Sequence, residues 1–273
     1  MQVGIFAKTF AGADPKTVLS HSAAAGYGCV QYNFACSGLA SMPDTVPEEA
    51  MHAIVSAMQA TGMEIAALSA TYNMIHPDRL VREAGMARLE VALKAAARLA
   101  IPLVTLCTGT RDSDDQWRHH PDNASAEAWR DLVTEMERAA AKAEALGIHL
   151  GIEPEQANVV QDAQCAVRLM REVPSQSLRI VFDPANLFEH ASQNEARSIV
   201  TRSIDVLADR IAMAHAKDRD AAGQFVTAGQ GIVDFPDLIS RLKQAGFDGP
   251  VVTHGLEEHE APEVARFLAG LIA

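Results

Sequence analysis

The chain alternates between short apolar runs and longer segments in which apolar residues recur every three or four positions. Short runs rich in β-branched residues are typical of buried strands, and the longer amphipathic segments are typical of helices. The pattern predicts strands at residues 1–7, 29–32, 64–70, 102–107, 148–152, 178–182, 211–214 and 251–253. It predicts a helix after each strand, at residues 15–25, 47–62, 77–100, 126–146, 162–173, 194–207, 235–245 and 260–272.

Local signals place the ends of several of these elements. Asp14-Pro15 combines an N-cap side chain with a proline in the first helical turn, and Gly26 ends the helix that follows. No proline- or serine-rich linker and no change of composition interrupts the alternation. We therefore expect a single domain over residues 1–273.

Strict alternation of strands and helices predicts an α/β fold in which helices cover a parallel sheet. Eight such units in about 250 residues fit a (β/α)8 barrel. The main alternative is an open doubly wound sheet, which usually has a glycine-rich turn after its first strand. The sequence AKTF at positions 7–10 is not such a turn. We therefore predict a (β/α)8 TIM barrel, whose functional residues lie at the carboxyl ends of the strands.

Composition and charge narrow the range of functions. The chain has 273 residues, of which 48% are hydrophobic, and this suffices for one large core. Its formal net charge of −12 argues against a nucleic-acid partner, although a small anionic substrate could still meet a locally basic site. Four cysteines without a CxxC pair indicate reduced thiols. No run reaches the roughly 18 apolar residues of a membrane span, so we predict a cytoplasmic protein without a membrane partner.

Four residues with metal-binding side chains end apolar runs in the second half of the chain. They are Glu153 in HLGIEPE, Asp183 in LRIVFDPANLF, His215 in RIAMAHAKD and His254 in GPVVTHGL. Their spacings of 30, 32 and 39 residues are those of successive βα units, so all four would meet at one barrel face. Taken singly, each fits a helix cap or a hydrogen-bonded strand end as well. Together, two carboxylates and two imidazoles predict a divalent cation, with Mn²⁺ preferred and Zn²⁺, Co²⁺, Fe²⁺ or Mg²⁺ as alternatives.

The motifs IEPE, FDPANL, HAKD and AGQGIVDF, in this order, resemble the sugar phosphate isomerase/epimerase family of xylose-isomerase-like TIM barrels. The resemblance covers essentially the whole chain. It implies a divalent metal, usually Mn²⁺, bound by Glu, Asp, His and a second Glu from the last four strands. Glu153, Asp183 and His215 match three of these positions. The fourth position is His254, where many members of the family carry Glu.

The histidine at the fourth position bears on the chemistry. For the sugar epimerases of the family, the resemblance implies two metal-bound glutamates that exchange a proton on opposite faces of one carbon. Glu153 is our predicted general base. His254 could take the second role only while it is not bound as a neutral ligand, because ligation occupies the nitrogen lone pair. Glu257 and Glu258 could replace it, although both fit a surface loop better. The predicted catalytic residues are accordingly Glu153 and His254.

The chemistry that the resemblance implies predicts an enzyme. A metal that bridges a carbonyl and an adjacent hydroxyl stabilises the enediolate formed by proton abstraction. We therefore expect a metal-dependent isomerase or epimerase that acts on a sugar, keto-sugar or related polyol. The first alternative is a lyase or dehydratase, in which the enediolate expels a β-hydroxyl. An endonuclease IV-like hydrolase would need further His and Asp ligands and a basic surface, and a non-catalytic sugar-binding barrel is the remaining alternative.

Further polar residues near the predicted strand ends are candidates for substrate binding, namely Asn73, His76, Arg111, Glu155, Asn186 and Lys217. Arg111 suits bidentate recognition of a carboxylate or phosphate, but it could instead pair with the aspartates that follow it. Asn186 occupies a place where many relatives carry a substrate-binding His. Glu155 and Lys217 fit solvated loop residues equally well. The loop of residues 108–125 is long enough for a lid or a subunit contact, which leaves a homo-oligomer open.

Overall fold

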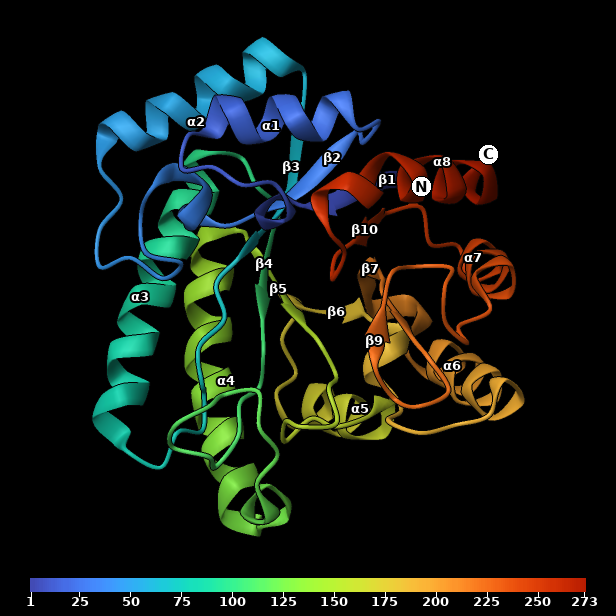
Figure 1. Cartoon of the computed structure of the whole chain (residues 1–273). Coiled ribbons are helices and arrows are strands. Elements are labelled where there is room, and N and C mark those ends of the chain that lie inside the picture. The colour runs from blue at the N-terminus through green and yellow to red at the C-terminus, as the bar shows by residue number, and fades with distance from the viewer.

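Eight parallel strands form a closed barrel in the computed structural model, which describes residues 1–273 (Figure 1). The barrel strands are β1 (Gln2–Phe6), β2 (Cys29–Tyr32), β3 (Glu64–Ser69), β4 (Leu103–Leu106), β5 (His149–Ile152), β6 (Leu178–Phe182), β7 (Ile211–Ala216) and β10 (Pro250–Thr253). Strands β2 and β4 are buried throughout, because helices cover the outside of the barrel and side chains fill its inside. All eight strands predicted from the apolar runs are confirmed.

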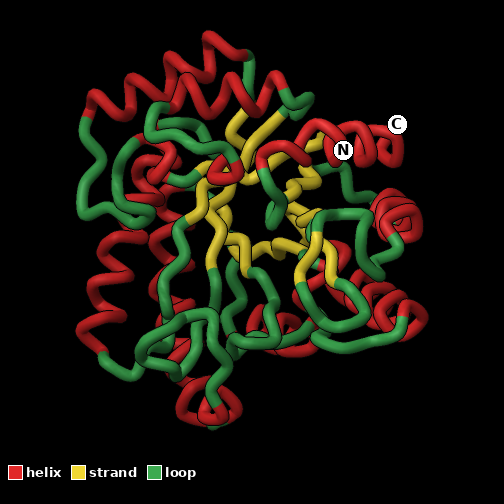
Figure 2. The backbone as a smooth tube through the Cα atoms, in the orientation of Figure 1, coloured by secondary structure: helices red, strands yellow, loops and turns green.

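The barrel strands follow one another around the ring in sequence order, and β10 pairs with β1 to close it. Figure 2 shows this ring of strands with the helices outside it. The closing pair is in register from Gln2 opposite Pro250 to Ile5 opposite Thr253. Parallel neighbours in sequence order are the arrangement that βα units produce. The carboxyl ends of all eight strands therefore open on one face, and residues that follow neighbouring strands lie side by side there.

The helices that surround the barrel are α1 (Pro15–Ala24), α2 (Glu48–Thr61), α3 (Arg79–Arg98), α4 (Ala126–Leu146), α5 (Ala163–Glu172), α6 (Gln193–Leu207), α7 (Phe235–Gln244) and α8 (Ala261–Ile272). The side chain of Asp14 accepts a hydrogen bond of 2.9 Å from the backbone N–H of Thr17, which confirms the predicted N-cap. The predicted helices are confirmed, with ends displaced by at most two residues. None of these helices combines the length and the hydropathy that crossing a lipid bilayer requires.

The inside of the barrel has an apolar floor with a polar layer above it. The floor consists of Ala67, Leu103, Val181, Met213 and Val252. Alternate residues of a strand point to the same side, so the residue two positions further along also faces inward, one layer closer to the carboxyl ends. Those positions are Ser69, Thr105, Asp183, His215 and His254. Strand alternation thus places three of the four candidate ligands in one inward-facing layer.

The segment between β7 and α7 contains a hairpin that the sequence pattern did not predict. Strands β8 (Asp218–Arg219) and β9 (Phe225–Val226) pair antiparallel next to the end of β7. Strand β7 itself extends to Ala216, two residues further than predicted. The prediction that His215 follows its strand is therefore wrong in detail, since His215 lies within β7. Its inward direction is unchanged by this.

Asp218 fixes the next loop against the end of β7. This fully buried carboxylate accepts hydrogen bonds of 2.8–3.1 Å from the backbone N–H groups of Gly229, Gly231 and Val233. A Cβ atom at Gly231 would lie 2.4 Å from Oδ1 of Asp218, so glycine is required there. The aspartate of HAKD and the glycines of AGQG thus meet in one contact that shapes the rim of the barrel.

Candidate metal centre

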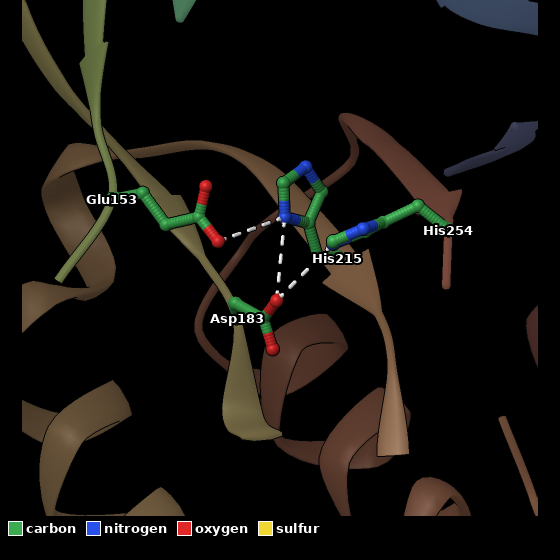
Figure 3. Close-up of side chains that lie close together, drawn as sticks. All are labelled: Glu153, Asp183, His215 and His254. Atoms are coloured by element: carbon green, nitrogen blue, oxygen red, sulfur yellow. Dashed lines mark hydrogen bonds and ion pairs between the residues drawn. The ribbon is translucent and has the colours of Figure 1, made fainter. Parts of the chain in front are cut away.

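Glu153, Asp183, His215 and His254 converge on one point at the carboxyl-end face of the barrel (Figure 3). One potential ligand atom of each residue lies within 4.8 Å of the others. Nδ1 of His215 is 3.2 Å from Oε1 of Glu153 and 3.5 Å from Oδ2 of Asp183. Nε2 of His254 is 3.4 Å from Oδ2 of Asp183. The residues come from β5, β6, β7 and β10, which are consecutive neighbours in the barrel, as the sequence spacing predicted.

Local hydrogen bonds orient the two carboxylates. Asp183 is the N-cap of the short 3-10 helix η4 (Pro184–Asn186), and its Oδ1 accepts a bond of 2.9 Å from the N–H of Ala185. That bond leaves Oδ2 directed at the two histidines. Oε1 of Glu153 accepts a bond of 2.7 Å from Nδ2 of Asn186, whereas Oε2 has no partner within the protein. In each carboxylate, an N–H donor therefore holds one oxygen in place, and the other oxygen can face a bound ion or substrate.

The buried charges of the cluster shift one another's protonation. Burial alone would raise the pKa of Asp183, but Lys217, His215 and His254 hold that pKa well below its usual range. Burial alone would lower the pKa of His215, but the charges of Glu153 and Asp183 raise it to about 9. Burial and the charge of His215 lower the pKa of His254. Without a cation, the carboxylates are therefore balanced by the His215 imidazolium and Lys217, while His254 stays neutral.

Lys217 and Asn186 contact the cluster directly. Lys217 is only 7% exposed, and its Nζ lies 3.1 Å from Oδ2 of Asp183. It also donates a hydrogen bond of 2.6 Å to Oδ1 of Asn186, whose Nδ2 bonds Glu153. The chain of contacts from Lys217 through Asn186 to Glu153 holds the glutamate in place. The structure thus places two of the predicted substrate-binding residues beside the candidate ligands.

The donor set fits a divalent cation. Two atoms bound at about 2.1 Å to one tetrahedral cation lie roughly 3.4 Å apart. Three contacts among the four side chains are 3.2–3.5 Å long, and all four potential ligand atoms lie within 4.8 Å of one another. Carboxylate oxygens and imidazole nitrogens together suit borderline divalent ions. The cluster of Glu153, Asp183, His215 and His254 could therefore bind a divalent metal ion with small side-chain movements.

Glu155 and the β8–β9 hairpin lie beside the cluster. Burial and the charge of Glu153 raise the pKa of Glu155 to about 7. Phe225 on β9 is 49% exposed, and its ring centroid lies 4.1 Å from Nζ of Lys217 and 4.0 Å from the guanidinium carbon of Arg219. These cation–π contacts hold an exposed aromatic surface next to the charged residues. The rim of the site is thus partly apolar.

Two of the predicted substrate residues lie apart from the cluster. Nδ2 of Asn73 donates to the carbonyl of Thr110 at 2.8 Å, and its Oδ1 accepts from the N–H of the same residue. Nε2 of His76 bonds the carbonyl of Ser113 at 3.0 Å. Both line a cavity of about 490 Å³ between the loops after β3 and β4, to which none of the four candidate ligands contributes. Their predicted contact with substrate stays a prediction.

Arg111, in the loop after β4, is held in an ion pair with helix α4. Its guanidinium lies 2.7 Å from Oδ2 of Asp131 on α4 and donates to the carbonyl of Ile75. Arg82 on α3 binds the same carboxylate at 2.6 Å. The predicted alternative of a structural ion pair describes the contact correctly. Its predicted partners are wrong, because Arg111 pairs with Asp131 and not with the aspartates that directly follow it. The sequence could not indicate a partner 20 residues away on another element.

Gln31 contacts the cluster directly, although the sequence pattern did not predict it. It lies on β2, it is 6% exposed, and its Oε1 is 2.9 Å from Nε2 of His215. Its Nε2 donates to Oγ1 of Thr105 on β4 at 3.1 Å. The available signal was a single amide side chain between Val30 and Tyr32 in an otherwise apolar strand. A buried amide of this kind requires hydrogen-bond partners inside the barrel.

A sequence profile of the family described as Xylose isomerase-like TIM barrel matches residues 19–271. No sequence among curated proteins matches the chain. The profile match covers helices α2 to α7 in full, α1 and α8 in part, and every barrel strand except β1. The shared pattern therefore includes the four strands that carry the candidate ligands.

Solved structures of low sequence identity share the fold over nearly their whole lengths. A D-allulose 3-epimerase from a Methylomonas species superposes with a TM-score of 0.75 at 17% identity, covering 99% of this chain and 98% of that one. The 3-keto-D-glucoside 4-epimerase from E. coli gives 0.76 at 15% identity, with coverage of 99% and 98%. A probable 3-DHS dehydratase from Bacillus anthracis gives 0.77 at 12% identity, with coverage of 98% and 99%. At such identities the likeness is one of fold.

Proposed function

Since the chain belongs to the xylose isomerase-like TIM barrel family, we propose that it is a divalent-metal-dependent isomerase or epimerase of a sugar, keto-sugar or related polyol. The observation that carries the proposal is the convergence of two carboxylates and two imidazoles at the catalytic face of the barrel. Similar folds in a D-allulose 3-epimerase and a 3-keto-D-glucoside 4-epimerase support it.

The metal would be held by Glu153, Asp183, His215 and His254, and Mn²⁺ is the ion we propose. When bound, it supplies a Lewis acid that polarises a carbonyl and stabilises the charge that develops beside it. Asp183 contributes the most deeply buried charge and His254 a neutral imidazole. Lys217 adds a positive charge at the same place, which favours a substrate group that becomes anionic during the reaction.

Glu153 is the proposed general base. Asn186 and His215 fix its Oε1, and its side chain remains 20% exposed, so the unpartnered Oε2 is available to a bound molecule. A fixed carboxylate with one free oxygen can remove a proton from the carbon next to a carbonyl. The exposed ring of Phe225 offers an apolar surface for the C–H groups of a carbohydrate near this base.

Isomerisation and epimerisation differ in where the abstracted proton returns to the substrate. Aldose–ketose isomerisation needs one base that moves a proton between adjacent carbons on the same face, and Glu153 alone suffices for this. Inversion of a centre needs a second group on the opposite face. His254, directly after β10, is the candidate for that role, which it could fill only while its imidazole is not bound to the metal.

A lyase or dehydratase is the second candidate, and the imidazole at position 254 favours it. With one glutamate instead of two, proton removal by Glu153 can be followed by loss of the β-hydroxyl as water, with the same proton returned from Glu153 to the leaving oxygen, rather than by delivery of a proton to the opposite face. The same base and the same Lewis acid would serve. The similar fold of a probable 3-DHS dehydratase supports this alternative.

Metal analysis and isotope exchange test the proposal. Gently purified protein should contain about one divalent transition-metal ion per chain. Incubation with keto-sugars in D₂O should place deuterium on the carbon next to the carbonyl, and a dicarbonyl product would instead indicate the lyase. Glu153→Gln should slow exchange by about 10²–10⁴-fold.

Glu258→Gln is the matched control for this experiment. Glu258 is exposed, and its carboxylate contacts only the N–H of Ala11 and the ring of His21. This variant should exchange deuterium at the wild-type rate. Equal loss of exchange in Glu153→Gln and Glu258→Gln would refute Glu153 as the base, and protein without bound metal would refute the site.

A further inference from the structure

His215 makes a contact behind the metal site that crosses the barrel interior. Its Nε2 lies 2.9 Å from Oε1 of Gln31, and both side chains are buried. Gln31 is on β2 and His215 on β7, with β1 and β10 between them in the ring. The contact therefore reaches across the barrel rather than along neighbouring strands.

The strand that carries Gln31 is irregular at this point. The register of β2 against β3 shifts between Val30 and Gln31. Such irregularities in a sheet redirect the side chains that follow them. Gln31 thus points inward at the level of the polar layer, where it meets Thr105 of β4 as well as His215.

The partners of the Gln31 amide define which end faces His215. Its NH₂ group donates to Oγ1 of Thr105 at 3.1 Å, so its carbonyl oxygen is turned toward the imidazole. A carbonyl oxygen only accepts hydrogen bonds. Nε2 of His215 must therefore carry the hydrogen. In the neutral ring, this leaves the lone pair on Nδ1, the nitrogen that faces Glu153 and Asp183.

A lone pair aimed at two carboxylates is unfavourable unless a cation lies between them. A metal ion supplies that cation and accepts the lone pair. Ring nitrogens that do not bind the metal commonly donate to a carbonyl or carboxylate, which fixes the tautomer and the ring orientation. The contact with Gln31 has this form.

We propose that Gln31 is a positioning residue of the metal centre, whose carbonyl holds the Nε2–H tautomer of His215 and presents Nδ1 to the ion. Thr105 assists by orienting the amide. The inference rests on the metal centre of the proposed function, but it requires no particular substrate or reaction. It assigns a role to β2, a strand that carries none of the four ligands.

Zinc affinity measured by competition with a chromophoric chelator tests the proposal. Gln31→Leu removes the acceptor and should weaken binding about 10–100-fold, the usual effect of losing a partner of a ligating histidine. Gln31→Glu keeps an acceptor and should bind zinc at least as tightly as the wild type. Thr105→Val frees the amide and should give a smaller loss than Gln31→Leu.

Gln156→Leu is the matched control, because it also deletes an amide hydrogen bond at the barrel mouth. Nε2 of Gln156 donates to the carbonyl of Leu187 and contacts no candidate ligand. This variant should keep the wild-type zinc affinity. Thermal unfolding of each variant separates a change at the site from a general loss of structure.

Nitrogen-15 NMR of the zinc-loaded wild type reads the tautomer directly, a property that a merely structural role would not fix. The His215 signals, identified by their absence in His215→Gln, should show hydrogen on Nε2 and zinc on Nδ1. Hydrogen on Nδ1, or unchanged affinity in Gln31→Leu, would overturn the inference. If Gln31→Leu does not fold, the tautomer of His215 in the wild type and the zinc affinity of Thr105→Val test the inference instead. A wild type that binds no zinc would refute the metal centre itself, whereas the other failures refute only the role of Gln31.

Discussion

Two parts of the barrel mouth carry polar residues after their strands, yet they use them differently. On the β5–β10 side, Glu153, Asp183 and His215 direct atoms at a common point. On the β3–β4 side, Asn73 forms its hydrogen bonds with nearby backbone groups, and Arg111 forms an ion pair with an aspartate of α4. The β5–β10 side leaves ligand atoms free to bind an ion or a substrate, whereas the β3–β4 side uses its polar side chains to stabilise loops.

The difference shows what a polar residue at a strand end needs in order to form a site. Position at the carboxyl-end face of the barrel is common to both groups, so position alone does not distinguish them. What differs is whether local donors and acceptors already satisfy the side chain. Oε2 of Glu153 has no partner within the protein, while both amide atoms of Asn73 are bonded.

Removal of one charge from each side gives the largest expected contrast. Asp183→Asn keeps the cap on Ala185 but loses a ligand charge, so zinc affinity should fall by more than about 100-fold, beyond the usual effect of losing a residue that only supports a ligand. Asp131→Asn makes the same chemical change on the β3–β4 side and should leave zinc affinity unchanged. Calorimetric titration of both variants measures this. Equal weakening in the two variants would contradict the division between the sides.

The pH dependence of stability should also differ between the metal-free and the metal-loaded protein. Since the pKa of His215 is raised to about 9, the folded protein holds this proton more tightly than the unfolded chain does. The resulting stabilisation is complete below about pH 6.5 and is lost as the pH rises through about 9. Its size should be roughly 1–3 kcal/mol.

Urea unfolding in the presence of EDTA at several pH values measures this loss. The metal-loaded protein should not show it, because a metal ion replaces the proton on His215. His215→Gln is the control and should lack the loss of stability even without metal. An identical decline in His215→Gln would assign the effect to other groups.

The smallest expected change concerns Arg111. Replacement by leucine should lower the free energy of unfolding by about 1–2 kcal/mol, because Asp131 retains Arg82 as a partner. Zinc affinity and KM should stay at their wild-type values. A large rise in KM with unchanged stability would instead support the role in substrate binding that the sequence predicted. Urea unfolding and steady-state kinetics on the same preparation distinguish the two results.

The barrel and its ligand face could be predicted from the sequence because both depend on local order. Apolar runs, helix caps and the spacing of βα units each extend over a few tens of residues. The four candidate ligands could be placed because they end consecutive strands, and consecutive strands become neighbours. The fold and the convergence of Glu153, Asp183, His215 and His254 followed from this.

Contacts across the barrel could not be predicted in the same way. Gln31 and His215 are 184 residues apart and lie on strands that are not adjacent. Arg111 has three aspartates within four residues but pairs with Asp131, because loop geometry rather than sequence distance decides the partner. The β8–β9 hairpin was missed because its strands contain only two residues each. Strands this short give no periodic signal.

The pairing of β1 with β10 sets the order in which the site can be completed during synthesis. The ribosome makes Glu153, Asp183 and His215 well before His254, and β10 must join both β1 and β7 to bring that histidine into place. The emerging chain would thus hold three ligands on an open sheet until its first and last strands meet. Binding of an ion by all four residues would then require that the barrel has closed. In the cell, loading with metal would coincide with the end of folding.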